Sequence, residues 1–318
     1  MEPDDLREEF QRNSRSYSRL KDEVLFILEP ALRDTDVKLH SVTSRIKTLD
    51  SFLDKVEKRE LEDPFQEVSD ILGVRIVCLF LSDIARIAGL IREAFVVVSE
   101  DNKIEGADVS SFGYMSVHFV VTLKPEYVGP RYRGLTELRF EIQVRTIAMD
   151  AWANVSHHLD YKSDKDVPDD LRRDFYALSG LFYVADKHFE MFYGSSKRSQ
   201  ARMTEFFEEA PPEERAKRDV DLDSLKAYLA TKFPQRQQAE ATQLSRLIKE
   251  LLPLGYNTIG DVDRLVDETH DAFIAYEKDH PPSGGDGKFL DVGVVRVSKQ
   301  LKHDPHYPEY RKLFKSAG

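Results

Sequence analysis

The 318-residue sequence predicts an α+β fold followed by a helical C-terminal module. Residues 137–146, ELRFEIQVRT, alternate strictly between polar and apolar side chains, which indicates a strand with one face in the core. Residues 113–123, GYMSVHFVVTL, alternate in the same way. Segments on both sides of these strands repeat apolar residues at helical intervals. We therefore expect a sheet with helices packed on it.

The polar faces of these two strands carry acid, base, amide and aromatic groups instead of the usual solvent-facing Lys, Glu and Thr. A solvated face of an antiparallel sheet would also be polar, so the strands alone leave both interpretations open. Residues 124–137, KPEYVGPRYRGLTE, are typical of a hairpin loop, which would bring the two faces together. The sequence thus favours one shared pocket, lined by Tyr114, Ser116, His118, Glu141, Gln143 and Arg145.

Before these strands, apolar spacing predicts helices at about residues 17–32 and 36–59, the second with a possible break near Thr43. On the second helix, Arg45, Lys47, Ser51 and Lys55 would form a basic, hydroxyl-bearing stripe along one side. A solvated charged face has the same pattern. The spacing by itself does not identify a site.

Residues 70–83, DILGVRIVCLFLSD, predict a strand that is buried on both faces. Arg75 lies in its middle and must find an anion or an aromatic face, because a guanidinium cannot be neutralised by deprotonation. Asp70, at the strand's entrance, is a candidate partner for Arg75 or a candidate metal ligand. Cys78 is the only cysteine, which excludes an intramolecular disulfide and a Cys-based zinc site. We expect Cys78 to be a core residue.

The rest of the chain is organised into two domains, residues 1–195 and 203–318. A helix over about 84–95, a short strand (FVVVSED) and helices over about 147–159 and 169–192 complete the first domain. Residues 193–202 are interpreted as a linker or a loose helix end. Helical patterns over about 222–233, 239–252 and 259–280, with a terminal segment over 289–314, predict the helical module of unknown role.

The formal net charge of −11 argues against a protein whose main role is general binding to nucleic acid. The amino terminus, MEPDDLREEF, is acidic and lacks the features of a secretory signal. No segment approaches the ~18 apolar residues of a membrane span. We therefore expect a cytoplasmic protein with no membrane partner.

The polar residues suit phosphoryl chemistry, which needs a divalent metal on carboxylates, cations on phosphate oxygens and a hydroxyl nucleophile. Asp70 and Glu141 supply carboxylates, and Tyr114 supplies a flat surface for a base. The sequence contains neither a Walker motif nor a Gly-rich dinucleotide loop, so side chains would hold the phosphates. The positive charges available are Arg45, Lys47, Lys55, Arg75 and Arg145.

Four blocks between about residues 41 and 162 resemble the synthetase domain of the RelA/SpoT family, especially the small stand-alone alarmone synthetases. They are SRIKTLDSFLDK, DILGVRIV, GYMSVHFVV and ELRFEIQVRTIAMDAWANVSHHLDYK. The resemblance implies a mixed, mainly antiparallel sheet flanked by helices, similar to nucleotidyltransferases. It implies a GTP pyrophosphokinase that moves the pyrophosphate of ATP onto the ribose 3′-hydroxyl of GDP or GTP, giving ppGpp or pppGpp and AMP. It also implies a Mg²⁺ cofactor and a homo-oligomer.

For the donor nucleotide, the resemblance implies that Arg45 and Arg75 sandwich the adenine. Lys47, Ser51 and Lys55 would contact the ATP phosphates. These roles would explain why an arginine is tolerated in an apolar strand, because a base can cover its charge.

For the reaction centre, the resemblance implies that Asp70 and Glu141 hold magnesium, with Glu141 also helping to deprotonate the attacking hydroxyl. Tyr114 would stack on the acceptor guanine. The other residues expected on the acceptor side are His118, Gln143, Arg145 and Lys162, the last of them near a phosphate.

The acceptor side departs from the family pattern, because Phe112 stands before Gly113 where many members have Asn. An alternative function is therefore a toxic member that pyrophosphorylates tRNA 3′ ends or adenine nucleotides. A third is an inactive nucleotide-sensing module. A tRNA substrate would need a basic track, for which the candidates are Arg12, Arg15, Arg19, Arg131, Arg133, Lys197 and Arg198.

Longer family members also carry a hydrolase domain with a metal-binding His-Asp pair. This chain has two His-Asp dipeptides, His270-Asp271 and His303-Asp304, both in the C-terminal module. Such dipeptides have low specificity, and we expect no hydrolase activity.

Overall fold

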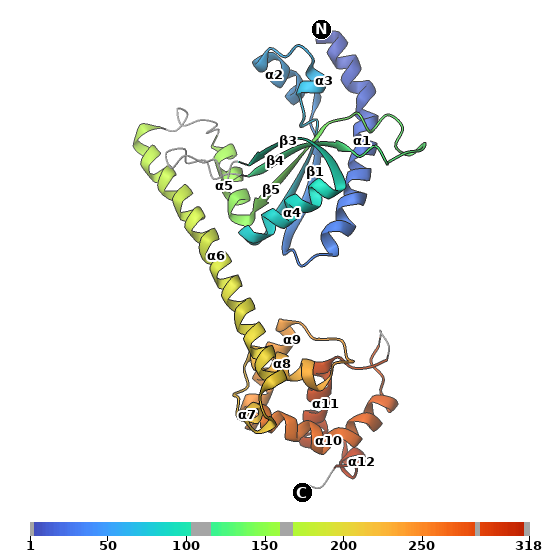
Figure 1. The fold of residues 1–318 in the computed structure, drawn as a ribbon, viewed down its shortest axis with the longest axis vertical. Helices are drawn as coiled ribbons and strands as arrows, with labels where there is room; N and C mark the ends of the chain where they lie inside the picture. The colour runs from blue at the N-terminus through green and yellow to red at the C-terminus, as the bar shows by residue number, and fades with distance from the viewer. Residues whose placement is uncertain (1–2, 103–115, 160–167, 284–286, 315–318) are drawn as a thin grey trace. The chain divides into compact units, whose positions relative to one another are not determined.

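The structure, a computed structural model, describes residues 3–102, 116–159, 168–283 and 287–314. The chain divides into two compact units, Met1–Tyr193 and Gly194–Gly318. Figure 1 shows the helices and strands of both units.

The first unit is an α+β domain. Its elements in chain order are α1 (Pro3–Arg33), β1 (Leu39–Ile46), α2 (Leu49–Arg59), α3 (Pro64–Glu67), β2 (Leu72–Cys78), α4 (Leu81–Ala94), β3 (Phe95–Asn102), β4 (Val117–Leu123), β5 (Phe140–Thr146), α5 (Ile147–His158) and the first part of α6 (Asp169–Glu209).

The five strands form one sheet in the order β1-β2-β5-β4-β3. Only β2 and β5 are parallel, and the three other pairs are antiparallel. The predicted mixed, mainly antiparallel sheet flanked by helices is therefore confirmed. β4 and β5 pair as neighbours, which also confirms the predicted hairpin.

One face of this sheet is apolar and is covered by α1 and α4. Leu20 and Val24 of α1 and Ile87 of α4 are fully buried in the same core as the inward-facing strand residues. The alternation in β5 buries Phe140 and Ile142 on this side. The intervening polar residues of β5 must therefore face the other side of the sheet.

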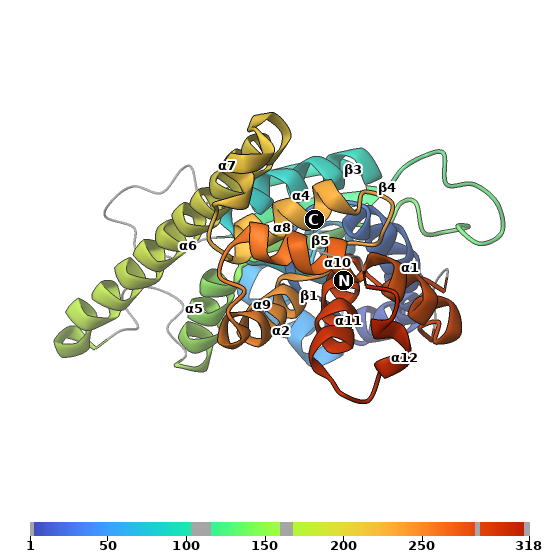
Figure 2. The ribbon, with the colours of Figure 1, turned by 90° about the horizontal axis from the view of Figure 1, so that it is seen from below.

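The loop between β4 and β5 is fastened to α1, which lies beside it in Figures 1 and 2. Arg131 Nε lies 2.6 Å from Glu23 Oε1, and the Arg131 guanidinium lies 4.8 Å from the centre of the Phe26 ring. Arg19 donates a hydrogen bond of 2.7 Å to the carbonyl oxygen of Arg131. Two arginines of the predicted basic track thus have a structural role.

The predicted helix over residues 36–59 is wrong in its first half, which is strand β1. β1 pairs antiparallel with β2 over residues 39–46. α2 begins only after Thr48, whose hydroxyl accepts a hydrogen bond from the backbone N–H of Ser51 at 3.3 Å. The β-branched residues Val42 and Thr43 suit a strand, and sheet pairing overrides the helical spacing of the apolar residues. Arg45 and Lys55 therefore do not share a helix face.

The segment proposed as a linker is helical, because α6 runs without interruption from Asp169 to Glu209. Polar residues and one glycine lower helix propensity but do not end a helix when no proline follows. The predicted strand over 70–83 is also shorter than expected, because β2 ends at Cys78 and α4 begins at Leu81. Cys78 is fully buried, and burial raises the pKa of its thiol to about 12, as expected for a core cysteine.

The second unit is helical. Beyond the end of α6 it contains α7 (Pro212–Ala216), α8 (Leu222–Lys232), α9 (Ala241–Leu251), η1 (Leu252–Leu254), α10 (Ile259–Asp279), α11 (Asp291–His303) and α12 (Pro308–Arg311). Its core contains Leu225, Leu247 and Val262, all fully buried. None of the helices in the described part of the chain is long and apolar enough to cross a membrane.

Candidate active site

A pocket of about 220 Å³ opens on the polar face of the sheet in the first unit. It is formed by β1, β2 and β5 together with the turn that precedes β2. Five of the residues predicted from the sequence line it. Its lining consists of Thr43, Ser44, Arg45, Asp70, Gly73, Val74, Arg75, Glu141 and Gln143.

Strand register explains why these side chains meet. Arg45 of β1 pairs with Gly73 of β2, and Gly73 pairs with Glu141 of β5. These three residues form one row across the sheet on the polar face. Because the middle residue has no side chain, the space between the arginine and the carboxylate stays open.

The next row contains Thr43, Arg75, Gln143 and His118 from four neighbouring strands. Arg75 and Gln143 line the pocket, whereas His118 extends the polar surface onto β4. The two alternating strands therefore contribute to one site, as the sequence favours.

Asp70 lies at the entrance to β2 and binds two lysines. Lys47 Nζ lies 2.7 Å from its Oδ2, and Lys55 Nζ lies 2.7 Å from its Oδ1. Burial by itself raises the pKa of Asp70, but the hydrogen bonds and charges of the two lysines outweigh it and hold the pKa below its ordinary value. Asp70 is therefore ionised at neutral pH. The lysines come from the end of β1 and from α2, so this contact also ties α2 to the sheet.

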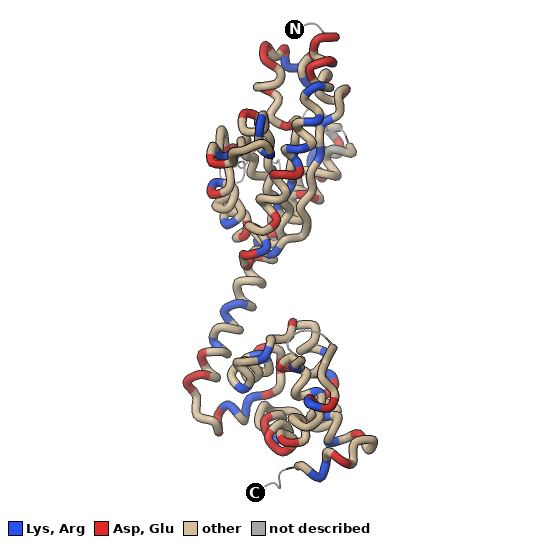
Figure 3. The backbone as a smooth tube through the Cα atoms, turned by 90° about the vertical axis from the view of Figure 1, so that its right-hand side faces the viewer, with Lys and Arg blue, Asp and Glu red and all other residues tan. Residues whose placement is uncertain are grey.

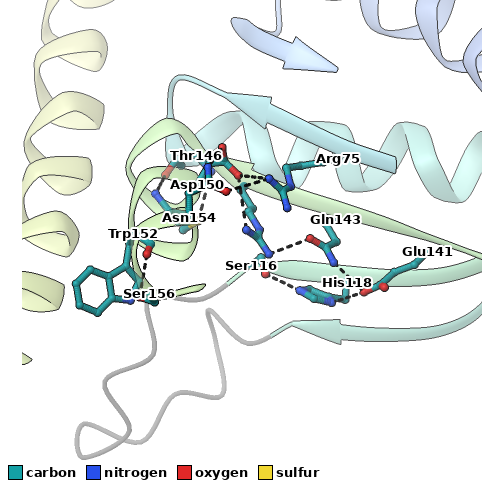
Figure 4. Close-up of polar contacts among 12 residues, drawn as sticks. Arg75, Ser116, His118, Glu141, Gln143, Thr146, Asp150, Trp152, Asn154 and Ser156 are labelled. Atoms are coloured by element: carbon teal, nitrogen blue, oxygen red, sulfur yellow. Dashed lines mark hydrogen bonds and ion pairs between the residues drawn. The ribbon is translucent and has the colours of Figure 1, made fainter. Parts of the chain in front are cut away.

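Glu141 is held by His118, as Figure 4 shows. His118 Nδ1 lies 2.5 Å from Glu141 Oε1, and His118 Nε2 lies 2.6 Å from Ser116 Oγ. Gln143 Nε2 donates a weaker hydrogen bond of 3.2 Å to the same carboxylate oxygen. Burial raises the pKa of Glu141. The hydrogen bond and charge of His118 lower it by more than burial raises it, so the pKa of Glu141 lies below its ordinary value. The negative charge of Asp70, which lines the same pocket, opposes this shift.

Arg75 finds its anion on α5. Its Nη1 lies 3.1 Å from Asp150 Oδ1 and 3.4 Å from Asn154 Oδ1. The candidate partner Asp70 is therefore wrong for Arg75, because the ion pair of Arg75 is with Asp150. The same Asp150 oxygen lies 3.6 Å from Arg145 Nη1, and Arg145 Nη2 donates to Gln143 Oε1 at 2.9 Å. A continuous polar network runs from α5 through β5 to β4 (Figure 4).

Ser51, predicted to contact the ATP phosphates, does not line this pocket. Ser51 lies in the first turn of α2, exposed, and its hydroxyl accepts a hydrogen bond from Thr48 Oγ1 at 2.9 Å. Tyr114 and Lys162 lie outside the described residues, as does Phe112, so their roles stay predictions.

Three features of the site are not among the residues predicted from the sequence: Asp150, Asn154 and the open space at Gly73. The first two stand four residues apart directly after the strand that carries Arg145, so they share one face of α5. That spacing, directly after a strand that carries an arginine, is the sequence pattern that could have indicated Asp150 and Asn154 as partners. The open space at Gly73 follows only from the pairing of β1 with β2, which the sequence pattern does not give.

The donor set of the pocket fits Mg²⁺. Magnesium in phosphate-transfer sites is bound by one or two carboxylates together with substrate oxygens and water. Asp70 and Glu141 supply two ionised carboxylates in one pocket. No cluster of three or more metal-binding residues exists among the described residues, so a metal here would rely on substrate oxygens.

Neither His-Asp dipeptide belongs to a group of three or more His, Cys, Asp or Glu residues that could hold a metal ion within the described part of the chain. His270 Nδ1 lies 3.0 Å from its own neighbour Asp271, and both side chains are exposed. His303 Nε2 lies 2.8 Å from the hydroxyl of Tyr256.

Comparison with known proteins assigns the chain to a family. Residues 44–166 match the region found in RelA/SpoT proteins. Two proteins of Bacillus subtilis (strain 168) are similar to the chain. The GTP pyrophosphokinase YjbM is 30% identical over 173 residues, which cover 53% of this chain and 78% of YjbM. The GTP pyrophosphokinase YwaC is 31% identical over 156 residues, which cover 45% of this chain and 69% of YwaC.

The fold agrees with this assignment. The crystal structure of small alarmone synthetase 1 from Bacillus subtilis superposes with a TM-score of 0.51 at 26% identity, covering 60% of this chain and 98% of the synthetase. A GTP pyrophosphokinase family protein from Streptococcus pneumoniae has the same fold, with a TM-score of 0.50 at 22% identity over 61% of this chain and 96% of that protein. The chain therefore belongs to the RelA/SpoT family, and its first unit has the fold of the small alarmone synthetases.

Proposed function

We propose that the first unit transfers the pyrophosphate of ATP onto the ribose 3′-hydroxyl of GDP or GTP, giving ppGpp or pppGpp and AMP. The observation that carries the proposal is the convergence of two ionised carboxylates, two lysines and two arginines at one pocket. The names of the Bacillus relatives support the same reaction.

The cations would bind the donor. Lys47 and Lys55 each use one N–H on Asp70, and an ammonium has three, so both can also donate to phosphate oxygens. Arg45 and Arg75 flank the pocket from two adjacent strands. A purine between their guanidiniums would gain cation–π stacking of about 1 to 2 kcal/mol in a desolvated site.

The carboxylates would serve the reaction centre. Asp70 and Glu141 would hold Mg²⁺, which would offset the negative charge of the triphosphate. The 3′-oxygen of the acceptor forms a bond to the β-phosphorus of ATP, and the bond from that phosphorus to the α-phosphate's bridging oxygen breaks, so AMP leaves. Glu141 accepts the hydroxyl proton, and His118 keeps its carboxylate ionised and oriented.

A labelling assay tests this function. The purified full chain is incubated with Mg²⁺ and ATP labelled in the β- or γ-phosphate, and GDP, GTP, ATP and deacylated tRNA are offered separately. We expect label to appear in GDP or GTP with release of AMP. Label only in tRNA, or only in a 3′-pyrophosphorylated adenine nucleotide separated from the ATP donor, would contradict the proposed acceptor and keep the donor site. Absence of transfer to all four would contradict the enzymatic function.

A further inference from the structure

A second, strongly basic pocket lies within the second unit. It has a volume of about 410 Å³ and is lined by Ser195, Arg198, Ser199, Arg202, Phe206 and Arg218 among others. Figure 3 marks the Lys and Arg residues of this part of α6 in blue. The arginine pocket, as we call it, plays no part in the candidate active site, which belongs to the first unit.

The fold brings its three arginines together from two segments. Arg198 and Arg202 stand one turn apart on α6, and Phe206 lies one further turn along the same face. Arg218 comes from the segment after α7 and places its guanidinium 4.3 Å from the centre of the Phe206 ring. Its backbone is fixed, because its carbonyl oxygen accepts a hydrogen bond of 2.8 Å from the N–H of Ile259.

These arginines lack acidic partners, unlike several others in the same unit. Arg198, Arg202 and Arg218 form no ion pair with any Asp or Glu of the described residues. Asp223 accepts a hydrogen bond of 2.5 Å from the hydroxyl of Ser199, a residue that lines the pocket. The arginines of the unit that do form ion pairs are Arg236 with Glu277, Arg264 with Asp261, and Arg296 with Glu250.

Three like charges in one pocket repel each other unless an anion joins them. Guanidinium groups bind phosphate oxygens with two parallel hydrogen bonds, which makes arginine the preferred residue for such anions. The hydroxyl of Ser195 adds a polar group on the same helix face. The volume also lies in the range of small-ligand sites, roughly 300 to 1,000 Å³.

We propose that the arginine pocket binds a diphosphate or triphosphate group, either as free pyrophosphate or as part of a nucleotide. The phosphate oxygens contact Arg198 and Arg202 of α6 and Arg218 of the segment after α7, and the Phe206 ring holds the Arg218 guanidinium in place. The proposal is independent of the catalytic function, because it concerns different residues in a different unit.

Hydrogen–deuterium exchange of the full chain, with and without pyrophosphate and in the absence of divalent cations, tests the site locally. We expect slower exchange in peptides that cover residues 195–206 and 215–220. Arg202→Gln and Arg218→Gln should each raise the pyrophosphate concentration needed for half of this protection by about tenfold, the usual effect of losing a charge-assisted hydrogen bond. A local readout separates this site from phosphate binding in the first unit.

Arg246→Gln is the matched control, because Arg246 is exposed, lies in the same unit and does not line the pocket. It should leave the protection unchanged. Parallel titrations with ATP and GDP show whether the ligand is free pyrophosphate or a nucleotide. If the concentrations needed for half of the protection equal that of pyrophosphate, the pocket recognises the phosphates alone. If the nucleotides need lower concentrations than pyrophosphate, a nucleotide is the ligand. Absence of protection with all three, equal binding by Arg202→Gln, or protection by a single-stranded oligonucleotide alone would overturn the proposal.

Discussion

The two carboxylates of the candidate active site are ionised although both are largely buried. An isolated carboxylate would be neutralised by such burial, because desolvation disfavours the charged form. Two lysines at Asp70 and one histidine at Glu141 reverse that effect. Both groups are therefore carboxylates at the same pH, as the roles proposed for them in metal binding and proton transfer require.

Substitution of either carboxylate tests the roles proposed for Asp70 and Glu141. Asp70→Ala and Glu141→Ala should leave the fold intact and abolish pyrophosphate transfer. Glu141→Gln, which keeps the shape, should lower kcat by about 100-fold or more, since general-base catalysis contributes 10² to 10⁴. Turnover is measured with saturating nucleotides, and circular dichroism checks the fold. Glu137→Gln, an exposed change just before β5, is the control. Wild-type turnover in Glu141→Gln would exclude it as the base.

The contact between His118 and Glu141 predicts a change in pH dependence. Burial raises the pKa of Glu141, and the hydrogen bond from His118 lowers it, so the native carboxylate loses activity only below the ordinary pH range of a Glu. His118→Gln removes the charge of the imidazole, whereas burial and the charge of Asp70 still raise the pKa of Glu141 and the hydrogen bond from Gln143 still lowers it. The acid limb of its pH–rate profile should therefore move to higher pH than in the wild type.

Comparison of the two profiles cancels the ionisation of the nucleotides, which is common to both proteins. His40→Gln is the control, because His40 is exposed on β1 and outside the pocket. An acid limb at unchanged pH in His118→Gln would mean that His118 does not set the protonation of Glu141.

Much of the residue chemistry was predictable from the sequence, because a charge in an apolar strand has few physical solutions. Arg75 had to meet an anion, and it does. Which anion it meets depends on where α5 begins, and the sequence carries no direct signal for that. Lys47 and Lys55 were predicted near the phosphates, but their contact with Asp70 arises only when α2 folds back toward β2.

Among the secondary-structure elements, the strictly alternating strands β4 and β5 were predictable from the sequence, whereas strand β1 was not. β4 and β5 alternate between core and polar face, so both their conformation and their exposed residues follow from period two. β1 is an edge strand in which every residue is partly buried or exposed, and its pattern of apolar positions fits a helix equally well. Its pairing with β2, a tertiary contact, decides the outcome.

The register of β1 and β2 places Gly73, which has no side chain, in the lining of the pocket next to Arg45. A larger residue at this position of β2 should therefore fill the pocket. A Cβ at Gly73 would meet only Arg45 Cγ, at 4.0 Å, so alanine fits. Gly73→Val places an isopropyl group, two methyl groups more than alanine, between Arg45 and Glu141. We expect it to weaken ATP binding by roughly 1 to 3 kcal/mol, the usual cost of overpacking.

Gly73→Ala is the matched control and should bind ATP nearly as well as the wild type. Valine suits a strand, so the fold should persist in both variants. Binding is measured by calorimetry with a non-hydrolysable ATP analogue and Mg²⁺. Equal affinity in Gly73→Val and the wild type would place the donor nucleotide elsewhere.

At the scale of the whole molecule, the chain has separate hydrophobic cores. The core of the first unit is built from α1, α4 and the sheet, and that of the second unit is built from α8 to α11 and the end of α6. The buried clusters of the two units have no residue in common among the described residues. Each unit therefore buries its own apolar surface, which is the physical requirement for folding independently.

Separate cores predict two unfolding transitions in calorimetry, and each should respond to a different change. A non-hydrolysable ATP analogue at 100 times its dissociation constant should stabilise only the first unit, by about 2.7 kcal/mol. Leu247→Ala removes a fully buried side chain in α9 and should destabilise only the second unit, by about 2 to 5 kcal/mol. Pyrophosphate transfer by Leu247→Ala should match the wild type at temperatures below both transitions, because the candidate active site shares no residue with the second core. One cooperative transition that both changes move would contradict the independence of the units, because the free energy of one core would then depend on the other.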